Sequence, residues 1–403
     1  RKLILITFII TLLPGAGKRL SFDDVQGKSP FKYAQLGMMS WYSNKNAYLT
    51  WGKNENKGAI VEVSFPERDT VTFVDSSAFY IDGNKLKVSR FTLDKTETKL
   101  LLLSNREQIW RHSYYGTYHI MDLKTKTLEP VSKDNTNLRN VKMSPDGKKV
   151  AYVRNDNNIY VYDLIRNREK KITTNGSKII LNGHFGWVYE EEFGSFDAYR
   201  WSPESQYIAY WEENQSQVPT FTMFDELSLY PTTQEIRYPK AGETNPTMSI
   251  FVANVKNGNR KKMNIGNTKD TYYPWMEWRD DSELIVMRMN RLQNQWEFLS
   301  VATKNGKSVS GLKESDLNGW VELHRNYHFL KNGNILWISE RSGWNHIFIH
   351  RTDGELVRQV TDGDWEVKRI IKVDEDDEIV YFIANKESTF ENRFYSIKFN
   401  GSS

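Results

Sequence analysis

The chain has 403 residues, of which 39% are hydrophobic and 13% aromatic, a composition typical of a globular protein with a large core. Its 55 basic and 51 acidic residues are scattered along the whole length, so no basic cluster predicts a nucleic-acid partner. Cysteine is absent, which excludes disulfides, thiolate metal sites and a cysteine nucleophile.

The first residues have the pattern of a secretory signal peptide. Arg1 and Lys2 precede the apolar run LILITFIITLL, which stops at Pro14 and is followed by the small residues of GAG. The run is too short to cross a bilayer comfortably. A buried strand or helix is the alternative, but a polar segment, GKRLSFDDVQGKSP, follows at once. We therefore predict a signal peptide over residues 1–17, one propeller domain over 18–403 and an exported protein.

From about residue 38 onwards one pattern recurs, in which an apolar residue and a polar turn precede an alternating strand of β-branched and aromatic residues. The units lie near residues 38, 89, 141, 199, 276, 327 and 371. Turn pairs such as the Asp-Gly of SPDG (144–147) separate stretches with the period of two expected of strands. Several units add a further strand, such as NNIYVYDL (157–164). The pattern predicts a four-stranded antiparallel unit that recurs about every 45 to 60 residues.

Seven such units are readable, with one long interval between residues 212 and 276. We expect this interval to hold loops, in QVPTFTMFDELSLYPTT, and one strand, in MSIFVANVKNG. Two β-sandwiches are the alternative for an all-β chain, but a period that runs through the whole length favours radial repetition. The predicted fold is therefore an all-β propeller of four-stranded blades.

Motifs for independent catalysis are missing. The G-x-S-x-G elbow of an α/β-hydrolase does not occur, and its nearest match is GKSVSG (306–311). Two histidine pairs, His324 with His328 and His346 with His350, have a spacing that could hold zinc on a helix. Both pairs lie in strand-like sequence with no carboxylate of the HExxH kind between them, so we predict structural or solvent-facing roles. No metal and no cofactor is predicted.

Three consecutive glutamates, Glu190, Glu191 and Glu192, stand between aromatic residues in GWVYEEEFGSFDAYRWSP. Such a run is ordinarily a solvated face. Here the flanking aromatic side chains indicate packed surface, where carboxylates need partners. Neighbouring carboxylates repel one another, so a site that keeps two together suits an ammonium group. Adjacent residues reach one cation only where the backbone forms a short helix or a bulge. Glycoside hydrolysis is a weaker alternative, because its paired acids come from separate elements.

The stretch WVYEEEF (187–193), followed by YRWSPESQYIAYWEEN, resembles the signature of the dipeptidyl peptidase IV family within the prolyl oligopeptidase group of serine peptidases. Further stretches agree in the same order, namely IWRHSYYGTYHIMDL (109–123), residues 217–255 and TDGDWEV (361–367). The resemblance extends from about residue 20 to the end. It implies an eight-bladed propeller that caps an α/β-hydrolase domain in an exopeptidase releasing X-Pro or X-Ala dipeptides.

The resemblance also implies roles for individual residues. Glu191 and Glu192 would bind the α-ammonium group of a peptide substrate, and Arg111 of WRHS would bind its first carbonyl. Arg325 of GWVELHR would line the same pocket, although His324 replaces the aromatic residue of the family there. Ion pairs of either arginine with a surface acid or a neighbouring strand remain alternatives, and Glu190 is a scaffold or solvent-facing residue.

The family's catalytic Ser, Asp and His lie C-terminal to the propeller, whereas this sequence ends at FNGSS. The resemblance therefore implies an eighth blade and a hydrolase domain outside these residues, and residues 1–403 alone are expected to be inactive. The expected partners are a peptide with a free N-terminus, the hydrolase domain and a second copy in a homodimer. The lack of cysteine favours a bacterial periplasmic or cell-surface protein. The competing hypothesis is a non-catalytic propeller that binds peptides or proteins.

Overall fold

The computed structural model describes residues 21–25 and 37–402, so the predicted signal peptide over residues 1–17 lies outside the described residues. A four-residue helix, α1 (Phe22–Val25), precedes the first sheet. The chain divides after Ser76 into two compact units, and we describe each by itself. None of the helices in the described ranges is long and apolar enough to cross a membrane.

In its described residues the first unit holds one antiparallel sheet, the first blade, whose strands follow one another in chain order. Its strands are β1 (Ser40–Trp41), β2 (Ala47–Trp51), β3 (Ile60–Ser64) and β4 (Thr70–Val74), with a short 3-10 helix at Asn54–Asn56. Leu49 and Ile60 are fully buried in this sheet, which gives the unit its own apolar centre.

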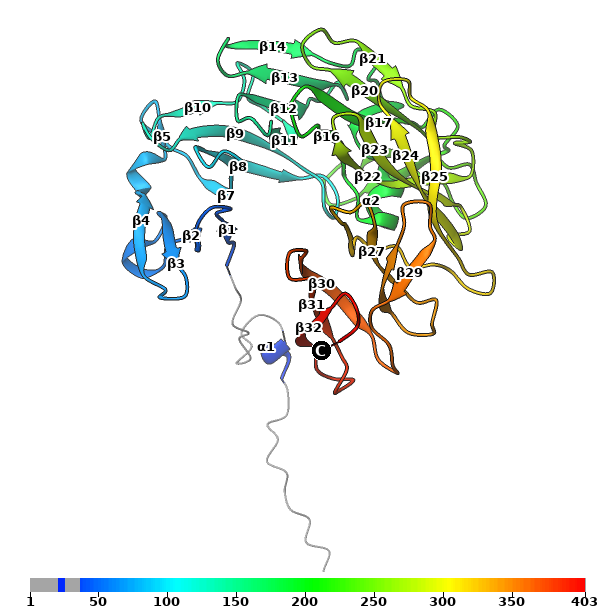
Figure 1. Ribbon diagram of the computed structural model, residues 1–403. Helices are drawn as coiled ribbons and strands as arrows, with labels where there is room; N and C mark the ends of the chain where they lie inside the picture. The colour runs from blue at the N-terminus through cyan, green and yellow to red at the C-terminus, as the bar shows by residue number, and fades with distance from the viewer. Residues whose placement is uncertain (1–20, 26–36, 403) are drawn as a thin grey trace, which may run out of the picture. The chain divides into compact units, whose positions relative to one another are not determined.

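The second unit holds six further blades, drawn one after another in Figure 1, and two separate two-stranded hairpins. A 3-10 helix at Ser76–Ala78 includes the point of division, and a small hairpin of β5 (Tyr80–Ile81) and β6 (Asn84–Lys85) follows it. The second blade contains β7 (Val88–Leu93), β8 (Lys99–Gln108), β9 (Tyr114–Asp122) and β10 (Leu128–Pro130). The third blade contains β11 (Arg139–Met143), β12 (Lys149–Val153), β13 (Ile159–Asp163) and β14 (Arg168–Lys171).

The remaining blades are also antiparallel, but among the described residues the fourth has five strands and the seventh has three instead of the predicted four. The fourth contains β15 (Ile180–His184), β16 (Asp197–Trp201), β17 (Tyr207–Asn214), β20 (Thr247–Asn254) and β21 (Arg260–Lys262). The fifth contains β22 (Thr271–Asp280), β23 (Glu283–Asn290), β24 (Gln295–Ala302) and β25 (Ser308–Ser315). The sixth contains β26 (Tyr327–Phe329), β27 (Ile335–Ser339), β28 (His346–His350) and β29 (Leu356–Gln359). The seventh contains β30 (Val367–Asp374), β31 (Ile379–Ala384) and β32 (Arg393–Lys398).

The prediction of a seven-unit propeller is confirmed, because seven such sheets occur in chain order within the described residues. The predicted SPDG turn joins β11 to β12, with Gly147 in the left-handed region at φ 66° and its N–H donated to the carbonyl of Ser144. Conversely, the long interval within the fourth blade holds more structure than expected. The predicted strand there is β20, which pairs with β17 over its full length.

The expectation of loops in QVPTFTMFDELSLYPTT was wrong. This stretch contributes to a two-stranded hairpin of β18 (Thr220–Asp225) and β19 (Thr232–Arg237). Six paired positions join the two strands, so the backbone groups that face the partner strand are satisfied locally although most of the side chains are exposed. The sequence alternation was too irregular to predict strands that bury so little.

Consecutive blades of the second unit share their apolar cores. Val150 and Tyr152 of β12 pack in a cluster with residues of the second blade. Ala151 and Val153, which alternate with them, pack in a cluster with residues of the fourth blade. This alternation follows from the period of two in a strand, which sends neighbouring side chains to opposite faces. The largest cluster joins the fourth, fifth and sixth blades, and it carries the candidate site.

Candidate functional site

The glutamate triplet lies on a short helix, α2 (Trp187–Phe193), between β15 and β16. Gly186 starts the helix in an extended conformation, and Gly194 ends it in the left-handed region at φ 59°. The helix confirms the prediction that the backbone turns here rather than continuing as a strand. Consecutive glutamates therefore project around one helix end instead of alternating across a sheet.

Aromatic packing holds α2 against the core. Tyr189 is fully buried and stacks on Phe185 with a ring-centroid distance of 4.8 Å. The Tyr189 hydroxyl oxygen accepts the backbone N–H of Tyr273 at 3.0 Å, which ties the helix to the fifth blade. Trp187 packs on Tyr238, again through ring contact. The inward face of the helix is thus fixed, and its acidic residues are held on a rigid support.

Glu190 is the fully buried member of the triplet. Its Oε1 accepts the backbone N–H groups of His112 at 2.7 Å and Ser113 at 2.8 Å. These residues follow Arg111 in the connection between β8 and β9, so Glu190 fastens the Arg111 segment to α2. Of the two roles left open for Glu190, the structure shows the scaffold. A contact across 77 residues of sequence gave no local signal that could have revealed it.

Arg139 accompanies Glu190 in the interior. It is buried, its guanidinium lies 5.5 Å from the centroid of the Tyr115 ring, and the charge of Glu190 favours its protonated form. Burial nevertheless lowers the pKa of Arg139 from its ordinary value. Glu190 Oε2 and two Arg139 nitrogens lack hydrogen-bond partners among the described residues. The pair therefore interacts through charge rather than through a direct hydrogen bond.

Glu191 and Glu192 are more accessible. Arg111 Nε lies 3.1 Å from Glu191 Oε2, with 70% of the Arg111 side chain and 22% of the Glu191 side chain exposed. The structure thus brings two predicted site residues together. Such an exposed ion pair contributes at most about 1 kcal/mol, so it leaves both groups free to exchange partners. Glu192 is exposed and has neither a hydrogen bond nor an ion pair with the part of the chain that the structure describes.

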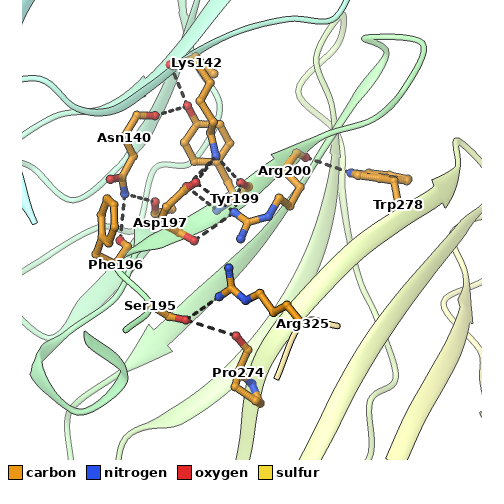
Figure 2. A network of polar contacts seen from close by, with 12 residues as sticks. Asn140, Lys142, Ser195, Phe196, Asp197, Tyr199, Arg200, Pro274, Trp278 and Arg325 are labelled. Carbon is orange, nitrogen blue, oxygen red and sulfur yellow. Dashed lines mark hydrogen bonds and ion pairs between the residues drawn. The ribbon is translucent and has the colours of Figure 1, made fainter. Parts of the chain in front are cut away.

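Arg325 reaches the segment that follows α2. Its Nη2 donates to the hydroxyl of Ser195 at 3.2 Å, and Ser195 also lies 3.5 Å from the carbonyl of Pro274 (Figure 2). Burial, followed by the charge of Arg200, lowers the pKa of Arg325 from its ordinary value. The structure therefore places Arg325 near the C-terminal end of the acidic helix, without a direct contact to Glu191 or Glu192.

The histidines identified by spacing have structural partners. His324 Nδ1 accepts the N–H of Asn326, so its Nε2 carries the proton that is donated to the carbonyl of Ile338 at 2.7 Å. Burial lowers the pKa of His324 to about 4, and its ring packs on Trp337 at 4.3 Å. A neutral histidine thus occupies the place of the expected aromatic residue and retains an aromatic contact.

The other paired histidines also contact protein groups. His328 Nε2 lies 3.2 Å from Glu375, His346 contacts Thr361 and the carbonyl of Gly363, and His350 contacts the carbonyl of Gly354. His346 and His350 lie on the strand β28, as their sequence context indicated. Across residues 21–25 and 37–402, no three His, Asp or Glu side chains gather as a metal site.

Glu213 supports the start of α2 and was missed by the sequence analysis. It is fully buried on β17, where its Oε2 accepts the N–H of Gly186 at 2.8 Å and its Oε1 accepts Nε2–H of Gln215 at 2.7 Å. Burial raises the pKa of Glu213 to about 7, against the opposing effect of these two donors. Two adjacent glutamates, Glu212 and Glu213, follow the apolar stretch of β17, and this was the available signal, but it did not specify the contact.

Comparisons with known proteins show which proteins the chain is similar to. A profile of the family described as "Dipeptidyl peptidase IV (DPP IV) N-terminal region" matches residues 94–403. Dipeptidyl peptidase 4 of Trichophyton rubrum is 30% identical over 400 residues, which cover 93% of this chain and 50% of the relative. A probable dipeptidyl peptidase 4 of Arthroderma benhamiae is 31% identical over 323 residues, covering 75% of this chain and 40% of the relative. The chain spans about half the length of the curated relatives it matches.

Solved structures show the same fold. The crystal structure of Porphyromonas gingivalis dipeptidyl peptidase 4 superposes with a TM-score of 0.87 at 28% identity, covering 96% of this chain and 55% of that chain. A putative dipeptidyl aminopeptidase IV from Bacteroides ovatus superposes with a TM-score of 0.71 at 18% identity, covering 93% of this chain and 54% of that chain. The second similarity concerns the fold alone.

Proposed function

The chain belongs to the dipeptidyl peptidase IV family, and from that premise we propose that its propeller binds the free N-terminus of a peptide for a serine exopeptidase. The observation that supports this function best is the end of α2. There Glu191 contacts the exposed Arg111, while the neighbouring Glu192 has no partner among the described residues. Two carboxylates beside one cation leave one negative charge available to a ligand.

An α-ammonium group matches this site chemically. It offers three N–H donors and a positive charge, and both carboxylates lie at the C-terminal end of a helix, where the helix dipole also favours a cation. Arg111, and more distantly Arg325, supply guanidinium donors for peptide carbonyl oxygens. A chain extended beyond its N-terminus would lack the charge, so the site accounts for exopeptidase specificity.

The proposed reaction is the release of X-Pro or X-Ala dipeptides by acyl transfer. We assign the Ser, His and Asp of the triad to an α/β-hydrolase domain outside residues 1–403, which is the second partner of the propeller. The propeller would admit and orient the substrate, converting binding energy into a favourable geometry at the distant serine. Residues 1–403 alone would then bind peptides without hydrolysing them.

The test uses the full-length protein and a chromogenic dipeptide substrate with proline second. Glu191→Ala and Glu192→Ala should each lower kcat/KM by about 10-fold to 100-fold, because each removes a charged hydrogen bond to the substrate. Glu129→Ala, on the exposed strand β10, is the matched control. Near-normal turnover in both site variants would refute the assignment.

A non-catalytic binding propeller is the second candidate, since the site described here contains binding groups only. The reading frame beyond Ser403 distinguishes the two: a GWSYGG-like elbow within the next few hundred residues supports the peptidase, and a stop codon supports the binding module. Isothermal titration of residues 1–403 with a free-amine peptide and its N-acetylated form tests the shared binding step. Equal affinity for the two forms would count against both candidates.

Export and dimerisation belong to the same proposal. The N-terminal apolar run supports transfer to the periplasm or cell surface, with a bacterial source favoured by the lack of cysteine, although relatives occur in fungi as well as bacteria. The β18–β19 hairpin exposes Phe224, Leu227 and Leu229, a surface suited to a second copy of the chain. Light scattering of the wild type and of Phe224→Ser tests the homodimer, and an unchanged mass would exclude this surface.

A further inference from the structure

A cavity of about 520 Å³ lies among the second, third and fourth blades, apart from the proposed ammonium site. Arg90 of β7, Lys142 of β11 and Arg200 of β16 line it, so three consecutive blades contribute a basic side chain. The aromatic side chains of Tyr114 and Trp201 also line the cavity. The cavity is therefore amphipathic, with charged groups that converge from separate elements.

The charges around this cavity do not balance. Four basic and two acidic side chains line it. One acid, Asp94, is occupied within its own turn, where it accepts the N–H groups of Thr98 and Lys99. The other, Asp197, is shared by two cations. Lys142 Nζ lies 2.6 and 2.8 Å from its carboxylate oxygens, and Arg200 Nη1 lies 3.2 Å away (Figure 2). One carboxylate for two cations leaves a net positive charge.

The environment of Lys142 also disfavours its positive charge. Burial, with a further contribution from the charge of Arg200, lowers the pKa of Lys142 to about 8 in spite of its contact with Asp197. Its ammonium group also lies 3.6 Å from the centroid of the Tyr199 ring. Arg90, which is exposed, has no acidic partner among the described residues. An additional carboxylate in the cavity would therefore stabilise the existing cations.

The cavity adjoins the segments that carry the proposed ammonium site. Phe196 lines the cavity and follows Glu192 by four residues, and Tyr114 lines it and follows Arg111 by three. The rings of His112 and Phe196 stack at 6.4 Å, which links the two segments directly. An extended peptide advances about 3.3–3.6 Å per residue, so a few residues suffice to connect neighbouring sites.

We propose that this cavity binds a carboxylate of the same peptide, carried by an acidic side chain or by the C-terminus, a few residues after the anchored N-terminus. This inference rests on the proposed function and gives it a substrate class: peptides with an anionic group beyond the released dipeptide. A carboxylate is the anion that unmodified peptides carry. The aromatic side chains that line the cavity suit the apolar part of the peptide next to this carboxylate.

Isothermal titration of residues 1–403 with a peptide series tests the proposal. Each peptide has proline second, and a single Glu or its isostere Gln is placed in turn at positions three to eight, with either an acid or an amide C-terminus. At one or two positions the Glu peptide should bind about tenfold more tightly than the Gln peptide. A preference for the acid C-terminus over the amide, without a side-chain effect, identifies the C-terminus as the source of the carboxylate.

Arg90→Glu should abolish this preference and leave the binding of the Gln amide peptides unchanged. Arg90 is exposed, so its substitution should not disturb folding. Arg168→Glu makes the same charge change on the outer strand β14 and is the matched control, for which the preference should persist.

The outcomes separate this inference from the proposed function. If Glu191→Ala weakens every free-amine peptide while all Glu and Gln pairs and both C-termini bind equally, the cavity inference is refuted and the ammonium site stands. If Glu191→Ala has no effect, but N-acetylated peptides keep an Arg90-dependent preference for carboxylates, the cavity stands without the ammonium site. Absence of binding by every peptide would overturn both.

Discussion

Replacing Glu213 by Gln should stabilise the protein at alkaline pH and have little effect near pH 4.5. The glutamine keeps the size of the side chain and an oxygen that can accept the N–H of Gly186, which starts α2. Its amide can donate to the oxygen of Gln215 once that side chain amide turns over. The variant therefore removes a titrating charge from the interior while preserving the hydrogen bonds around it.

The magnitude follows from the pKa of Glu213, which burial raises from 4.5 to about 7. Between these values the folded state holds the proton and the unfolded state has lost it, so the stability contribution falls as pH rises across this window and is constant above it. One pKa unit corresponds to about 1.36 kcal/mol, so the wild type loses roughly 3 kcal/mol of unfolding free energy across this window. The glutamine variant does not lose this free energy, because its side chain does not titrate. Because the side chain is fully buried, solvent screening does not reduce this figure.

Differential scanning calorimetry at half-unit intervals from pH 4.5 to 8.5 measures the effect. The difference in melting temperature between Glu213→Gln and the wild type should grow with pH and level off above pH 7. Glu212→Gln, on the preceding residue of β17, is the matched control for loss of a charge on the same strand. A difference that stays constant over the whole range, or shrinks with pH, would refute the reasoning.

Three further predictions concern contacts around the site. Glu190→Gln should make amide hydrogen exchange at Ser113 about tenfold faster, because a neutral amide is a weaker acceptor than a carboxylate; unchanged exchange would show that Glu190 does not hold this segment. Gly186→Ala should destabilise by roughly 1–3 kcal/mol in denaturant titration, since its Cβ would collide with the Gln215 amide, and a neutral result would contradict that packing. Tyr199→Phe should cost about 1–2 kcal/mol in the same assay, as the buried hydroxyl lies within hydrogen-bond distance of two backbone carbonyls.

The blades were predictable from sequence because their determinants are local. The turn at 144–147 combines a Pro-Asp-Gly sequence with flanking alternation, and both act within a few residues. In β12 the apolar run is uninterrupted, since each face packs on a different neighbouring blade. The β18–β19 hairpin escaped prediction because its strands bury little, so selection for apolar alternation is weak there.

The candidate site was predictable only in part. Adjacency of Glu191 and Glu192 required a local turn of the backbone, and the helix α2 provides it. The roles of Glu190 and Glu213 depend on partners in three dimensions, Ser113 and Gly186, that lie far away in sequence. The cluster of Lys142, Asp197 and Arg200 likewise joins two blades. The periodicity of apolar residues cannot identify such pairings, because from sequence alone the same charged residues would be assigned to the solvated surface.

The shared cores have a consequence for how the second unit opens. Because each core belongs to two or three consecutive blades, removing one blade from contact exposes part of its neighbour's core, so nearest-neighbour interfaces govern cooperativity. The cluster beneath α2 spans three blades and includes Val188 and Tyr189 of the helix itself. We therefore expect α2 to be among the last elements to lose amide protection during subglobal unfolding, so the acidic residues would keep their geometry while blades elsewhere fluctuate.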